Sequence, residues 1–148
     1  MLNRICAIFL LLGLNTSPSV AEEQPLVSGI GGLFFRSESP ADLAAWYEHH
    51  FAISRVPTSY EQEPWQQESG PTVFAPFAKD TAYFGDKKHQ WMLNLRVRQL
   101  DELIRRLRAS DIEVSDPEQF PNGRFARLSD PEGNPIQLWE PVLPDLAK

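Results

Sequence analysis

The last third of the chain holds a run of turn-forming residues between two apolar segments, and this run constrains the fold more than any other feature. The turn residues are DPEGN at positions 130–134, and the flanking segments are Phe125–Leu128 and Ile136–Trp139. Asp-Pro and Gly-Asn favour turns, so the pattern predicts a β-hairpin. Because side chains alternate along a strand, we expect Gln137 and Trp139 on one face and the aliphatic residues that alternate with them on the other.

The first 21 residues have the composition of a secretory signal peptide. A basic Arg4 precedes an apolar run, Ile5–Leu14, and the small residues Ser19, Val20 and Ala21 form a cleavage site. The apolar run is about half of the roughly 20 residues that span a bilayer, which disfavours a permanent membrane helix. We therefore predict an exported protein, periplasmic or secreted, with residues 22–148 as its mature part and no membrane contact after cleavage.

The composition of the mature part excludes several classes of function. Cleavage after Ala21 would remove Cys6, the only cysteine, so we expect neither a disulfide nor a catalytic thiol. The formal net charge of the whole chain is -6 and no basic block is present, so nucleic acid is not an expected partner. The chain also lacks a nucleophile elbow, a P-loop and a dinucleotide fingerprint. The remaining length suits a single domain.

Two helices are predicted from the spacing of apolar residues. Ser39 can cap a helix over Pro40–Phe51, and Asp42 completes a Ser-x-x-Asp capping pattern. The second helix has an apolar stripe with helical spacing and ends near Ser110. That stripe consists of Leu100, Leu103, Ile104 and Leu107.

Strands are predicted around both helices. The clearest lies at residues 91–98, where Leu93, Leu95 and Val97 alternate with polar or flexible residues and are expected under the second helix. Proline and glycine between positions 53 and 88 should keep the strands there short. The other predicted strands are Leu26–Arg36, Ser54–Tyr60, Thr72–Phe77, Thr81–Phe84 and Ile112–Val114. The chain thus repeats one pattern twice: a strand, a helix and several short strands.

Three segments resemble the vicinal-oxygen-chelate superfamily, which includes glyoxalase I, bleomycin-resistance proteins and extradiol dioxygenases. They are GIGGLFFRSESPADLAAWYEHHFAI, MLNLRVRQLDELIRRLRAS and the terminal hairpin. The resemblance implies an α+β fold of two βαβββ modules, at about residues 26–85 and 89–141. Each module would be a curved mixed sheet around a cleft, with one helix packed against it, in a single domain over residues 22–148. Such proteins often dimerise, so a homodimer is a further expectation.

The resemblance also implies where a metal would be bound in related enzymes. It places Gly32, Met92 and Gln137 at ligand positions. Glycine has no ligand side chain, and a thioether is a poor ligand for the divalent metals of such sites, so no metal cofactor is predicted. The alternative is a divalent metal such as Zn, Ni, Fe or Mn, held by a shifted set of His89, Gln137 and Glu140.

The residues predicted to bind a small-molecule ligand share the expected cleft face. Aromatic walls with an amide and guanidinium groups could fix a carboxylate, phosphate or carbonyl oxygen. The aromatic and methionine residues suit a core or a dimer interface equally well. The predicted set is Phe34, Arg36, Met92, Asn94, Arg96, Gln137 and Trp139.

The predicted function is metal-free binding of a small anionic or carbonyl-bearing organic molecule. Two alternatives stay open. One is a metal-dependent glyoxalase-like lyase or isomerase, or a dioxygenase, in which the metal polarises the oxygens of the substrate. The other is an interaction module whose cleft is filled by a partner subunit, which a cleft plugged by Trp139 or Phe34 would favour. Whether the protein is an enzyme is therefore left open by the sequence.

Overall fold

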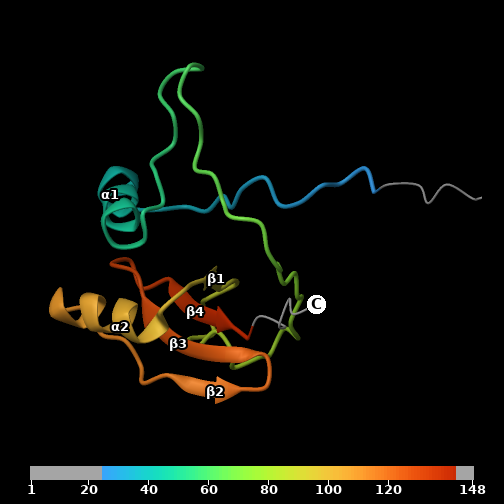
Figure 1. The fold of residues 1–148 in the computed structure, drawn as a ribbon, viewed down its shortest axis with the longest axis vertical. Coiled ribbons are helices and arrows are strands. Elements are labelled where there is room, and N and C mark those ends of the chain that lie inside the picture. The colour runs from blue at the N-terminus through green and yellow to red at the C-terminus, as the bar shows by residue number, and fades with distance from the viewer. Residues whose placement is uncertain (1–24, 143–148) are drawn as a thin grey trace, which may run out of the picture. The chain divides into compact units, whose positions relative to one another are not determined.

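The computed structural model describes residues 25–142, so the predicted signal peptide lies outside the described residues. The chain divides after Phe34 into two units. Residues 25–34 of the first unit form no helix or strand, and every helix and strand found within residues 25–142 belongs to the second unit (Figure 1). Among the described residues, no helix has the length and apolar character needed to cross a membrane.

A four-stranded mixed sheet and one helix are formed by the last third of the chain. The elements follow the order β-α-β-β-β, and the sheet order is β1-β4-β3-β2. Strand β1 runs parallel to β4, and the other neighbouring strands are antiparallel. The fold is therefore α+β, with one βαβββ arrangement. Its elements are β1 (Leu93–Arg96), α2 (Leu100–Ala109), β2 (Glu118–Phe120), β3 (Gly123–Ser129) and β4 (Pro135–Pro141).

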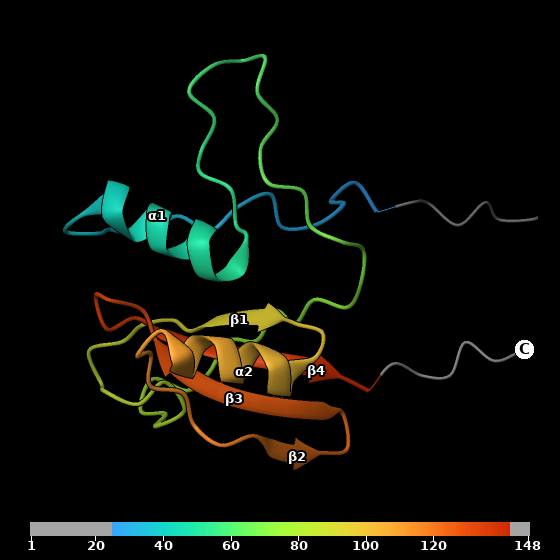
Figure 2. The same cartoon turned by 60° about the vertical axis from the view of Figure 1, so that its left-hand side comes forward.

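The core lies between α2 and one face of this sheet. Figure 2 shows α2 in front of that face. Leu100 and Leu107 of α2 are buried against Ile136 and Leu138 of β4. Burial of aliphatic side chains is the main favourable term in folding. The aliphatic side chains buried here lie on one side of α2 and on the facing side of β4. The predicted helical stripe and the predicted alternation along β4 are both confirmed.

The first helix, α1, spans Pro40–Phe51, which matches the prediction, and adds Leu43 to the same core. Its predicted cap is wrong, because the side chain of Ser39 makes no capping hydrogen bond. The carboxylate of Glu132 accepts from the backbone N–H of Ser39 at 2.9 Å, which is the bond that Asp42 would make in the predicted pattern, and from the hydroxyl of Ser37 at 2.7 Å. The hairpin turn therefore supplies the acceptor that α1 would otherwise provide locally.

Asp130 organises the turn between β3 and β4. Its buried carboxylate accepts from the backbone N–H groups of Glu132 and Asn134, both at 2.9 Å, and from the phenol of Tyr47 on α1 at 3.0 Å. The predicted hairpin is confirmed, with Ser129 and Pro135 as its last paired residues. The turn thus closes the hairpin and fixes α1 beside it.

The first of the two predicted modules is not formed. The strands predicted there are wrong, because no residue from 25 to 92 belongs to a strand or pairs with one. Proline removes backbone donors from this region, and its apolar side chains are not covered: Val56 is 86% exposed and Phe74 is 87% exposed. The incorrect strands are Leu26–Arg36, Ser54–Tyr60, Thr72–Phe77 and Thr81–Phe84.

The strands of the second half differ in extent from the prediction. The strand expected over 91–98 is limited to Leu93–Arg96, and Gln99 then takes a left-handed conformation that starts α2. The strand expected at Ile112–Val114 is reduced to a single bridge from Val114 to Leu128. Strand β2 was not predicted, since its short sequence has no apolar alternation.

Candidate functional site

A polar row crosses the face of the sheet opposite α2. Asn94 of β1 pairs in register with Gln137 of β4, which pairs with Arg127 of β3. Asn94 Nδ2 donates to Gln137 Oε1 at 2.8 Å, and Gln137 Nε2 donates to the phenol oxygen of Tyr83 at 2.8 Å. Gln137 is only 6% exposed, so both ends of a buried amide have partners. The contact with Asn94 fixes the orientation of this amide.

An aromatic row lies beside the polar row on the same face. Trp139 of β4 pairs in register with Arg96 of β1 and with Phe125 of β3. The rings of Trp139 and Phe125 are stacked, with centroids 6.1 Å apart and planes 4° apart, and Phe120 meets Phe125 edge-on. Trp139 Nε1 donates to the carbonyl oxygen of Asn122 at 3.0 Å, so the indole has a fixed position. The row forms a flat apolar surface.

Residues 68–84, here called the covering segment, are attached to this face at two places. At the first, the guanidinium of Arg96 donates to the carbonyl oxygen of Pro71 at 2.8 Å and to that of Glu68. The carboxylate of Glu68 also pairs with Arg98. The attachment therefore depends on the two arginines around the end of β1.

Tyr83 provides the second attachment. The guanidinium of Arg127 donates to the carbonyl oxygen of Tyr83 at 2.8 Å, and its Cζ lies 4.4 Å from the centroid of the phenol ring. Phe77 stacks on Tyr83, with centroids 4.9 Å apart and planes 18° apart. Because Gln137 bonds the phenol oxygen, the ring and the oxygen of Tyr83 are both held by the polar row.

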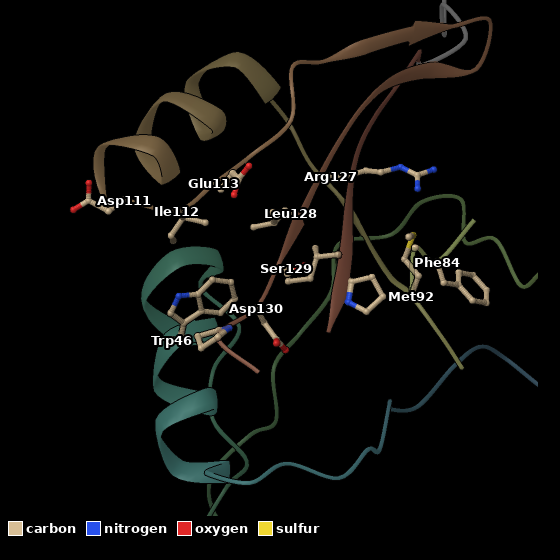
Figure 3. A pocket seen from close by; sticks show the side chains of 14 residues that line it. Trp46, Phe84, Met92, Asp111, Ile112, Glu113, Arg127, Leu128, Ser129 and Asp130 are labelled. Atoms are coloured by element: carbon tan, nitrogen blue, oxygen red, sulfur yellow. The ribbon is translucent and has the colours of Figure 1, made fainter. Parts of the chain in front are cut away.

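An open cavity of about 490 Å³ surrounds the end of β3 next to the hairpin turn. Figure 3 shows Trp46 and Ile112 on one side of the strand and Phe84, Met92 and Arg127 on the other. The cavity therefore continues from the edge of the core to the edge of the polar row. Arg127 is the residue of the polar row that lines it.

The predicted ligand residues fall into three groups. Asn94, Arg96, Gln137 and Trp139 lie together on the face opposite α2, and Met92, which precedes β1, lines the cavity. Alternation along β1 and β4 accounts for this grouping. Whether any of these residues binds a ligand stays a prediction.

The remaining predicted ligand residues are Arg36 and Phe34. Arg36 lines a hollow at the hairpin turn together with Glu132 and contributes to neither row. Phe34 belongs to the first unit. The first predicted strand would have carried both residues, and it is not formed.

The alternative metal ligands do not converge. Gln137 and Glu140 lie on opposite faces of β4, because they have opposite parity along the strand. The carboxylate of Glu140 accepts from the backbone N–H of Leu100 at 3.0 Å, and His89 Nδ1 lies 3.2 Å from the carbonyl oxygen of Phe84. Within residues 25–142, no three His, Cys, Asp or Glu side chains gather as metal ligands. His89, Gln137 and Glu140 therefore do not form one ligand set in this arrangement.

Sequence reasoning missed Tyr83, Arg127 and Phe125. Arg127 and Phe125 could have been found, because pairing across the DPEGN turn puts them opposite Gln137 and Trp139. Tyr83 had no such signal, since it lies in a segment with neither a strand nor a helix.

The comparisons with known proteins are partial. No protein-family model matches the chain, and no curated protein matches it. An antibiotic binding protein from Streptomyces sp. CB03234 shares 40% identity and a TM-score of 0.33, over 34% of this chain and 41% of that chain. A glyoxalase/bleomycin resistance protein from the same organism shares 36% identity and a TM-score of 0.32, over 34% of this chain and 46% of that chain.

The chain therefore spans less than half the length of either solved structure. Matches of this extent do not establish the fold of the whole chain or its ligand. Membership of the superfamily is accordingly a proposal that rests on the sequence motifs.

Proposed function

We propose that the protein is an exported member of the glyoxalase/bleomycin-resistance superfamily that binds a small anionic or carbonyl-bearing organic molecule without a metal. The observation that carries this proposal is the buried amide of Gln137 on the face of the sheet opposite α2. A buried amide needs hydrogen-bond partners, and Gln137 has one at each end: Asn94 at its oxygen and Tyr83 at its nitrogen. The Gln137 N–H that binds Tyr83 is the group that a ligand would use.

The neighbouring side chains suit an organic molecule with oxygen at one edge. Trp139 and Phe125 offer a flat apolar surface, and Arg96 and Arg127 stand at its two sides. A few polar groups on a largely apolar wall are typical of small-molecule sites. Guanidinium and amide N–H groups recognise carboxylate, phenolate and carbonyl oxygens.

Isothermal titration calorimetry tests this proposal with benzoate, 4-hydroxybenzoate and 1,4-naphthoquinone as probes. We expect at least one probe to bind, and Gln137→Leu to weaken that binding about tenfold, the equivalent of about 1.4 kcal/mol. Arg105→Gln, on the exposed side of α2, is the matched control and should leave binding unchanged. Absence of binding by every probe, or equal binding by Gln137→Leu, would contradict the proposal.

The absence of a metal requirement is tested by elemental analysis of the purified protein. The support for it is that Gln137 Oε1, the atom that a metal would use, accepts from Asn94, and that Glu140 lies on the other face of β4. We expect no stoichiometric Zn, Ni, Fe or Mn after dialysis. A metal that survives dialysis and is lost in Gln137→Ala would overturn this part of the proposal.

Export is tested by cell fractionation and N-terminal sequencing. The support for it is the apolar run Ile5–Leu14 and the small residues that end at Ala21. We expect a mature chain that begins at Glu22 outside the cytoplasm. An uncleaved chain in the cytoplasm would exclude export.

A further inference from the structure

The side chain of Tyr83 makes the contacts that an aromatic ligand would make at the proposed site. Its oxygen accepts the Gln137 N–H at 2.8 Å, Arg127 lies over its ring, and Phe77 stacks on it. A hydrogen bond to the oxygen, a cation on the ring and an aromatic neighbour together recognise a phenol. These contacts define a phenol-sized position on the face of the sheet.

Tyr83 is not fixed there as a core residue would be. It is 37% exposed, and the covering segment around it forms no helix or strand. Arg96 and Arg127 hold that segment mainly by its backbone carbonyl oxygens. Segments with few buried apolar contacts open at a small free-energy cost, so Tyr83 can leave while the sheet stays folded.

We propose that Tyr83 is a built-in occupant of the ligand site, and that this site takes a planar aromatic molecule with a phenolic hydroxyl or ring carbonyl oxygen, which displaces Tyr83. The inference rests on the proposed function and narrows its ligand class. The Gln137 N–H points at the phenol oxygen of Tyr83, so a ligand that replaces the phenol should offer an acceptor oxygen at that place. The oxygen of a phenol, phenolate or quinone meets this requirement.

An internal occupant lowers the apparent affinity for an external ligand. The apparent dissociation constant is the intrinsic value divided by the fraction of molecules in which the site is free. Removal of the Tyr83 ring should therefore strengthen binding of a molecule that replaces it. Removal of an unrelated tyrosine should have no such effect.

The probe for this experiment is p-cresol, which reproduces the tyrosine side chain, and toluene is its counterpart without oxygen. We expect Tyr83→Ala to bind p-cresol about tenfold more tightly than the unchanged protein does. It should also prefer p-cresol to toluene by about three- to tenfold, as one hydrogen bond predicts. In Tyr83→Ala combined with Gln137→Met, that preference should disappear.

Two controls separate this effect from a general loosening of the protein. Tyr60→Ala, at a fully exposed tyrosine, should leave p-cresol affinity unchanged. Tyr83→Phe keeps the ring and removes the oxygen. It should tighten p-cresol binding about threefold, because the internal ring loses its hydrogen bond. This variant tests the inference if Tyr83→Ala does not fold. The inference is overturned if p-cresol binds equally tightly to the unchanged protein and to the Tyr83 variant that folds. It is also overturned if Tyr83→Ala binds toluene as tightly as p-cresol.

The outcomes also separate this inference from the proposed function. If benzoate or the quinone binds in a Gln137-dependent way and the Tyr83 variants gain nothing for p-cresol, the proposed function stands and the internal occupant is wrong. If no probe shows Gln137-dependent binding, both are wrong.

Discussion

The phenol of Tyr47 on α1 donates a hydrogen bond to Asp130 Oδ2 at 3.0 Å, across 83 residues of sequence. Burial, reinforced by the Asp130 carboxylate, raises the pKa of the Tyr47 phenol, so this group stays protonated and able to donate at neutral pH. The same carboxylate shapes the hairpin turn through Glu132 and Asn134. One buried charge therefore couples the first helix to the strand that carries Gln137.

Removing this phenol should destabilise the fold. Tyr47→Phe leaves a buried carboxylate with one partner fewer, so we expect the free energy of unfolding to fall by about 1–3 kcal/mol. Urea denaturation measures the change. Tyr60→Phe is the matched control, since Tyr60 is fully exposed, and it should stay within about 0.5 kcal/mol of the unchanged protein. An equal loss of unfolding free energy in the two variants would show that the hydrogen bond between Tyr47 and Asp130 does not stabilise the fold.

Glu132 should make the stability depend on pH in the acid range. The hydrogen bond from the Ser37 hydroxyl, followed by that from the Ser39 N–H, lowers the pKa of the Glu132 carboxyl below its ordinary value of 4.5. A depressed pKa in the folded state gives stability that is present above the unfolded pKa and is lost as the pH falls through the folded pKa. Glu132→Gln should therefore be less stable than the unchanged protein near neutral pH.

That difference should shrink as the pH is lowered below 4.5. The difference in stability is measured from the urea midpoints of both proteins between about pH 7 and pH 2.5. Glu113→Gln is a suitable control, because Glu113 is exposed and its side chain makes no hydrogen bond within residues 25–142. A deficit in Glu132→Gln that stays constant down to the lowest pH would rule out the carboxylate as its source.

Gly123 should tolerate no side chain. Its φ of +144° is one that other residues rarely adopt, and an added Cβ would collide with the backbone oxygen of Glu140 and lie 2.6 Å from Trp139 Nε1. Gly123→Ala should cost about 1–3 kcal/mol of stability and displace the indole. Thermal melting and tryptophan fluorescence measure the two effects. Gly31→Ala adds a methyl group where nothing lies within 4 Å, so its melting temperature should not change.

The helices and the hairpin could be predicted because their signals are local. Pro40 opens α1, the spacing from Leu100 to Leu107 defines α2, and DPEGN joins two strands that pair with each other. The cap of α1 could not be predicted, since Glu132 reaches Ser37 across 95 residues. Capping patterns describe only the neighbours of a helix start.

The strands expected in the first half failed because an apolar segment becomes a strand only where a partner strand accepts it. The segment Leu26–Arg36 has suitable residues but no described pairing partner. The same limit applies to the candidate site. Alternation placed Asn94 and Gln137 on one face, whereas Tyr83 arrives from a segment without periodicity, 54 residues before its partner Gln137.

The most direct test of this account is an NMR titration of the protein with whichever of the three probes binds most tightly, observed at side-chain N–H signals. We predict the largest shifts at the amide groups of Asn94 and Gln137 and at the indole N–H of Trp139, because these groups lie on the face opposite α2. Signals from α2 should move little. Shifts concentrated on α2, or no saturable shift at Gln137, would contradict the claim that this face binds the ligand.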